Sequence, residues 1–253
     1  MNLNSLHFSP GCVAITAALL FLIPGCRSTS GVADLSIQEL ESGRDHLARP
    51  LPGDPAALYR LQVPSSGGLR LVVRTSGGQG RLTVSEPFGS AVSLTAWTAS
   101  DPPVFFDLRE GCRLDAADMS QVLGVRALPL PAAVRLLGGR LPAEPGDSVS
   151  VRDGGRLVVE GRGWAAVVAI EADPWRVVSV EEERADGEPG WRIVLSRHTS
   201  SVPGLLRVEQ ASGRWAKLEL VRLEWTDGDD LPALPDLPLC LPPKTSDSHR
   251  GSQ

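Results

Sequence analysis

The sequence lacks the features that mark a nucleic-acid-binding protein. Its 253 residues contain no run of Lys or Arg, and the formal net charge at neutral pH is −5. A protein that binds a phosphate backbone needs basic residues clustered on one surface. Nucleic acid is therefore not an expected partner.

Enzyme signatures are also missing. The sequence has no GxSxG motif, no CxxC motif and no Cys/His spacing typical of a metal site. Its histidines fall in the leader, a predicted helix, a polar turn and the tail, at His7, His46, His198 and His249. The acidic turn Asp227–Asp230 lacks the ligand spacing of a calcium loop. We therefore expect no catalytic residues, no metal and no cofactor.

Only one apolar run is long, and it lies at the N-terminus. Val13–Ile23 is too short for a membrane span of about 20 residues and has the length of a signal-peptide core. It leads into Ile23-Pro24-Gly25-Cys26, which resembles the lipobox of bacterial lipoproteins. The resemblance implies that residues 1–25 are a signal peptide and that Cys26 is lipidated.

The lipobox departs from the usual pattern in two ways. Pro24 stands where Ala or Ser is common, and the segment before the apolar run carries no Lys or Arg. Cys12 is a poorer candidate, because no apolar run precedes it. Residue 27 is Arg rather than Asp, so the familiar inner-membrane retention signal is absent. The resemblance thus implies a lipid anchor in the outer membrane, with the protein facing the periplasm.

Two further cysteines, Cys112 and Cys240, would lie in an oxidising compartment. A disulfide between them is permitted there, and two unpaired thiols are an equally open interpretation.

After the leader, the pattern indicates one short helix and then many strands. Ser36 and Glu39 form a capping-box pattern that predicts a helix over residues 35–48. Alternating apolar and polar residues predict strands near 69–73, 82–85, 92–97, 104–108, 156–160, 164–171, 175–183, 191–196, 205–209 and 215–225. Two short helices are predicted at 116–123 and 131–137, the second ending at Gly138-Gly139.

These elements predict a mainly β fold, an antiparallel sheet with one apolar face that a few short helices must cover. The expected organisation is an anchor, linker and short helix over 26–55, a β domain over 56–226, and a disordered Pro- and Asp-rich tail over 227–253.

Three motifs between residues 80 and 142 resemble the LolB family of outer-membrane lipoprotein receptors. They are GRLTVSEPFGS, GCRLDAADMSQVLG and ALPLPAAVRLLGGRLP, in the family's order. The resemblance implies that residues 56–226 form an antiparallel curved sheet, an open half-barrel that is closed by a few short helices and binds acyl chains. It implies a LolA-like periplasmic carrier as partner, and insertion of lipoproteins or lipids into the outer membrane. It also implies that Phe88, between Pro87 and Gly89, acts in transfer to the membrane. The alternative is that Phe88 folds back onto the sheet.

The predicted cavity residues are the apolar ones expected on the inward side of the strands and helices. The alternative for each is that it fills a dry core. They are Leu71, Val73, Leu82, Val84, Val92, Leu94, Phe106, Leu123, Val134 and Leu137. A rival function is a structural lipoprotein subunit of a cell-envelope complex, with the same fold and a closed cavity.

Overall fold

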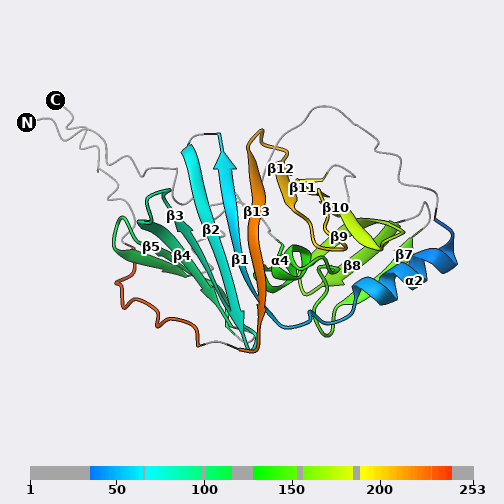
Figure 1. Ribbon diagram of the computed structural model, residues 1–253, viewed down its shortest axis with the longest axis horizontal. Helices are drawn as coiled ribbons and strands as arrows, with labels where there is room; N and C mark the ends of the chain where they lie inside the picture. The colour runs from blue at the N-terminus through cyan, green and yellow to red at the C-terminus, as the bar shows by residue number, and fades with distance from the viewer. Residues whose placement is uncertain are drawn as a thin grey trace, which may run out of the picture.

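The chain forms one antiparallel sheet that curves around two helices (Figure 1). The computed structural model describes residues 35–64, 66–98, 101–115, 128–152, 156–184, 189–228 and 230–240. Within these residues the helices are α2 (Ile37–Leu47) and α4 (Leu130–Leu137). The strands are β1 (Asp54–Val63), β2 (Ser66–Ser76), β3 (Gln79–Ser85), β4 (Ala91–Trp97), β5 (Val104–Asp107), β6 (Cys112–Asp115), β7 (Ser148–Arg152), β8 (Arg156–Gly161), β9 (Trp164–Glu171), β10 (Arg176–Glu182), β11 (Trp191–Ser196), β12 (Leu205–Gln210) and β13 (Trp215–Thr226).

The sheet consists of two meanders that meet at its centre. Strand order across the sheet is β6-β5-β4-β3-β2-β1-β13-β12-β11-β10-β9-β8-β7. The first and last strands therefore pair, with Leu61 opposite Leu218 and Ala57 opposite Leu223. The chain passes from the edge strand β6 to the other edge strand β7 through a connection that contains α4. This topology places α4 where both meanders can contact it.

One face of the sheet, here called the inner face, packs against the helices. Alternate residues of each strand point to it, as in Tyr59 and Leu61 of β1 or Leu71 and Val73 of β2, and all four are fully buried. The opposite, outer face carries the charged residues between them. The predicted fold class, a mainly β open curved sheet closed by short helices, is confirmed.

Helix α2 lies within the predicted range 35–48. Ser36 and Glu39 form the predicted capping box, which typically stabilises a helix by about 1 kcal/mol. The helix packs against β7 and β8 near one end of the sheet. Gly43 lets it approach closely, because a Cβ at this position would lie 2.6 Å from Ile170 and 2.7 Å from the ring of Trp175.

A β-bulge at the start of β4 reverses the predicted orientation of Leu94. Val84 pairs with Ser93 and Ser85 pairs with Ala91, so Val92 is an extra residue in the strand. Val92 is buried in the core, but the residues after it exchange faces. Leu94 lies opposite Thr83 on the outer face, and the prediction that it lines the inner face is wrong.

Phe106 is also on the outer face, because it pairs with Leu94. Its neighbour Phe105 pairs with Thr95 and occupies the inner face instead. Both rings are buried, so burial alone does not distinguish them. Because Phe105 and Phe106 are adjacent and both apolar, the sequence does not show which of them faces inward. The prediction that Phe106 faces inward is wrong.

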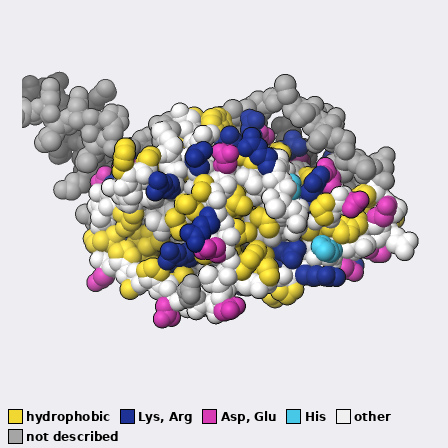
Figure 2. All heavy atoms as spheres, in the orientation of Figure 1, with side chains coloured by type: hydrophobic (Ala, Val, Ile, Leu, Met, Phe, Trp, Pro, Cys, Tyr) yellow, Lys and Arg dark blue, Asp and Glu magenta, His cyan; other side chains and the backbone are white. Residues whose placement is uncertain are grey.

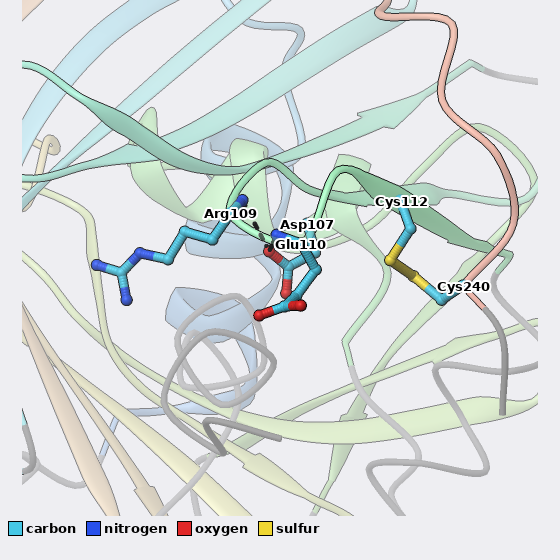
Figure 3. Close-up of a disulfide and its surroundings, with 5 residues drawn as sticks. All are labelled: Asp107, Arg109, Glu110, Cys112 and Cys240. Carbon is cyan, nitrogen blue, oxygen red and sulfur yellow. Dashed lines mark hydrogen bonds between the residues drawn. A yellow bond between two sulfur atoms is a disulfide. The ribbon is translucent and has the colours of Figure 1, made fainter. Parts of the chain in front are cut away.

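Part of the predicted disordered tail is ordered. Residues 230–240 follow β13, and their end runs beside the edge strand β6. Arg113 N donates to Pro238 O at 2.8 Å, and Cys240 N donates to Arg113 O at 2.9 Å. Cys112 and Cys240 form a disulfide at this point (Figure 3). The prediction of disorder fails for this segment because the disulfide and the two backbone hydrogen bonds attach it to β6. A search for periodic apolar residues does not reveal such an attachment.

Several predictions lie outside the described residues. They are the signal peptide, the lipidation site Cys26, the helix over 116–123 with Leu123, and the tail after Cys240. Strands β1, β6 and β7 were not predicted. Among the helices that the structure describes, none has the length and apolar character needed to cross a membrane.

Candidate functional site

An apolar cavity lies between α4 and the inner face of the sheet. Its volume is about 30 Å³. This is room for a water molecule or two and is far below the roughly 300–1,000 Å³ of typical small-molecule sites. All its lining side chains are apolar, and they are Val73, Leu82, Leu130, Ala133, Val134, Leu136, Leu137, Ile193, Leu206, Val208 and Leu218. A polar ligand is therefore disfavoured there, and the cavity must enlarge to hold any sizeable apolar ligand.

The two ends of helix α4 differ in the contacts that the structure describes. It begins after Pro129, which makes no side-chain capping hydrogen bond. At the other end Gly139 has a φ of +74°, and a Cβ there would lie 2.3 Å from the carbonyl oxygen of Ser201. Gly139 is therefore required both for its backbone conformation and for its close approach to Ser201.

Arg135 of α4 joins the end of this helix to the end of α2. Its Nε donates to Leu141 O at 3.0 Å, and Nη2 donates to Ala48 O at 3.0 Å. Burial lowers the pKa of Arg135, and the positive charge of Arg140 lowers it further, yet a guanidinium stays protonated. These bonds fix the C-terminal end of α4 against the chain that follows α2.

The structure places the predicted cavity residues in three groups. Val73, Leu82, Val134 and Leu137 line the cavity. Three others, Leu71, Val84 and Val92, are buried in the surrounding core without lining it. Leu94 and Phe106 lie on the outer face, as described above, and Leu123 is outside the described residues.

Seven lining residues were not predicted. Those of α4 are Leu130, Ala133 and Leu136, and those of the second meander are Ile193, Leu206, Val208 and Leu218. The alternation of apolar and polar residues that predicted strands β11, β12 and β13 also indicates that the four strand residues point to the same face of the sheet. What was missing was the pairing of β13 with β1, which brings the two meanders to the same cavity.

Phe88 lies at the tip of the turn between β3 and β4, and its side chain is 98 % exposed. It does not fold back onto the sheet. Gly89, with a φ of +99°, completes the turn, and Gly89 N donates to Glu86 O at 3.0 Å. Glu86 pairs with Arg109 of the neighbouring β5–β6 turn. The two turns are thereby linked beneath an exposed aromatic ring.

The β5–β6 turn is itself ordered by Asp107. One of its carboxylate oxygens accepts hydrogen bonds from the backbone N of Arg109 and of Glu110, both at 3.0 Å (Figure 3). The disulfide at Cys112 follows directly. This end of the first meander is therefore held by local bonds.

The outer face of the central strands is basic. Arg60 lies opposite Arg70, and Arg74 lies opposite Arg81. Figure 2 shows dark blue Lys and Arg side chains over this part of the sheet, among apolar ones. Like charges directly opposite one another normally destabilise a strand pair, and Glu219, 3.7 Å from Arg60, offsets one of them. Because the outer face carries these charges, an uncharged apolar ligand fits the inner face and not the outer face.

His198 makes a structural contact, and the described residues hold no cluster of metal-binding side chains. They contain no group of three or more His, Cys, Asp or Glu side chains that could hold a metal. Nε2 of His198 lies 2.9 Å from Val177 O, which can only accept, so this nitrogen carries the hydrogen. Burial lowers the pKa of His198. The ring therefore has a structural contact in its neutral form.

Comparison with known proteins shows similarity of structure alone. Neither a family model nor a curated protein matches the sequence. A LolA superfamily protein from Nitrosomonas europaea superimposes with a TM-score of 0.50 and 12 % identity, over 78 % of this chain and 96 % of that one. A DUF1329 family protein from Desulfovibrio piger also gives 0.50, with 10 % identity over 76 % and 92 %. The chain thus has a LolA/LolB-like fold.

Proposed function

We propose that this chain is an outer-membrane lipoprotein that faces the periplasm, binds acyl chains between α4 and the inner face, and helps insert lipoproteins or lipids into the outer membrane. A LolA-like periplasmic carrier would deliver the ligand. The observation that carries the proposal is the entirely apolar lining shared by a helix and both meanders. Burial of an acyl chain contributes about 0.8 kcal/mol per methylene, so such a surface binds one without polar contacts.

Binding requires α4 to move away from the sheet, because the cavity is small in the structure. The helix is bonded at Arg135 and confined at Gly139, whereas its first turn lacks a side-chain cap. We propose that the N-terminal end of α4 swings outward and that the Gly138-Gly139 end is the pivot. Apolar side chains of Leu130 and Val134 would then exchange sheet contacts for ligand contacts.

Filling the cavity tests the site. Ala133 is half-buried on α4 and lines the cavity, so Ala133→Phe should place a ring where an acyl chain would lie. We expect affinity for the methyl ester of a pyrene-labelled fatty acid to fall at least tenfold. Overpacking costs about 1–3 kcal/mol of stability, which a protein of this size can tolerate. Fluorescence titration measures the affinity, and a thermal melt confirms folding.

Ala56→Phe is the matched control, because Ala56 is a half-buried alanine on β1 opposite Arg74 and Glu224, on the outer face. It should leave binding unchanged. If both variants lost the same amount of affinity for the ester, the loss would be a general effect of adding a ring and not an effect of filling the cavity. Failure of the wild-type protein to bind the ester at micromolar concentration would count against the proposed function itself.

Phe88 gives a test of membrane transfer that is separate from binding. Phe88→Glu should leave the melting temperature within a few degrees of wild type, because a 98 % exposed ring has little packing to lose. Acyl binding should persist. Transfer of bound lipid or lipoprotein to liposomes should be lost, because a carboxylate replaces the ring that would enter the apolar layer.

Ile37→Glu is the control for Phe88→Glu, since Ile37 is another exposed apolar side chain, at the start of α2. It should not change transfer. A collapsed melting temperature for Phe88→Glu would assign the ring to packing, and normal transfer would remove its role.

A second candidate is a structural lipoprotein subunit of a cell-envelope complex. The observation that favours it is the small volume of the cavity, about 30 Å³. Native mass spectrometry of the mature protein decides between the two, because a carrier retains an acylated ligand on purification. A scaffold instead retains a stoichiometric protein partner and no lipid.

A further inference from the structure

Two hydroxyl groups on the inner face are buried without hydrogen bonds and belong to residues that do not themselves line the cavity. Tyr59 of β1 and Thr95 of β4 are 0 % and 1 % exposed. In the described part of the chain neither the Tyr59 hydroxyl nor the Thr95 Oγ1 has a partner. Burial raises the pKa of the Tyr59 phenol, so the group stays a neutral O–H donor. Buried hydroxyls without partners are costly and uncommon, and Phe and Val would fill the same space without that cost.

The strand register places both residues next to cavity-lining side chains. Tyr59 lies on the inner face of β1, between β2 and β13. Val73 of β2 and Leu218 of β13 are its diagonal neighbours, and both line the cavity. Diagonal neighbours are within reach of an aromatic side chain. Thr95 lies directly opposite Leu82, which also lines the cavity.

We infer that Tyr59 and Thr95 donate hydrogen bonds to the carbonyl oxygens of acyl esters or amides held in the opened cavity. The inference rests on the proposed acyl-binding function and names its ligand class, acyl groups that keep their ester or amide linkage. A bare hydrocarbon would leave both hydroxyls without partners. A free fatty acid would bury a carboxylate in a cavity whose lining includes no cation.

Competition binding tests this inference. Methyl palmitate, hexadecane and palmitate displace the pyrene-labelled methyl ester from wild-type protein and from Tyr59→Phe. We expect the preference of wild type for methyl palmitate over hexadecane to fall about tenfold in Tyr59→Phe, with hexadecane affinity unchanged. Comparing the preference between proteins cancels the different solubilities of the ligands. Because the buried hydroxyl is removed without loss of the ring, the melting temperature of the unliganded variant should be equal or higher.

Thr95→Val should lower the same preference, and Thr83→Val should not. Thr83 is the matched control because it lies on the outer face of the neighbouring strand β3. An unchanged preference in both Tyr59→Phe and Thr95→Val would overturn the inference while leaving acyl binding intact. Wild-type protein that binds neither methyl palmitate nor hexadecane would overturn the proposed function as well.

The carbonyl ligand could come from a phospholipid or from a lipoprotein, since both carry acyl esters. Phosphatidylethanolamine and a triacylated cysteinyl peptide are therefore used as further competitors. The competitor that displaces the labelled ester more strongly identifies the source of the carbonyl group. This result supports the inference if the Tyr59→Phe substitution weakens that displacement. If neither competitor displaces the labelled ester, the result counts against the inference.

Discussion

Removal of the disulfide, in the variant Cys112→Ser/Cys240→Ser, is expected to lower the free energy of unfolding by about 2–4 kcal/mol. The bond joins positions 128 residues apart, so in the unfolded chain it closes a long loop and removes much conformational freedom. The melting temperature should fall by roughly 5–15 °C. Denaturant titration and a thermal melt measure both quantities.

The segment 230–240 should also become less firmly attached to the sheet when the disulfide is removed. Without the disulfide, residues 230–240 keep two backbone hydrogen bonds between Arg113 and the segment from Pro238 to Cys240. Limited proteolysis should then cleave this segment while the sheet survives. Reduced wild-type protein is the control and should behave like the double variant. If the variant unfolds at the same denaturant concentration as oxidised wild type, the disulfide contributes nothing to stability.

Cys26→Ala is expected to eliminate the processed, lipid-anchored form of the protein completely. The proposed anchor is the lipid on Cys26. Acylation contributes about 0.8 kcal/mol per buried methylene, and more than one chain is needed for stable attachment. Cell fractionation and the intact mass of the protein measure the outcome. The variant should also keep its leader, because cleavage depends on the modified cysteine.

Cys12→Ala is the matched control for Cys26→Ala, since Cys12 lies before the apolar run. It should leave processing and anchoring unchanged. Processed, membrane-bound Cys26→Ala protein would show that the lipidation assignment is wrong.

The sequence predicted strands well where one face alternates cleanly. Residues 164–171 and 191–196 were predicted as strands, and β9 and β11 have these bounds. Strand β1 was missed although Ala57, Tyr59 and Leu61 alternate in it, so the same rule could have found it. Strand β6 carries the charged Arg113 and Asp115 beside Leu114, and β7 at the sheet edge has no fully buried position.

The site was harder to predict than the fold because it depends on register and on distant pairing. One extra residue at Val92 sends Leu94 to the outer face, and no local pattern marks such a bulge. The lining residues Leu206 and Leu218 reach the cavity only through the pairing of β1 with β13. Phe88 was easier, because a Pro-Phe-Gly turn between two strands indicates a tip.

The pairing of β1 with β13 also sets the order in which the molecule can be built. Asp54 and Thr226 face each other across this pair, and 172 positions separate them along the chain. As the chain is made, β1–β6 can form hairpins early, yet their inner face stays uncovered until α4 follows and β13 arrives last. Contacts this distant in sequence slow folding. Nearly the whole polypeptide must therefore be present before the two meanders can join into one continuous sheet.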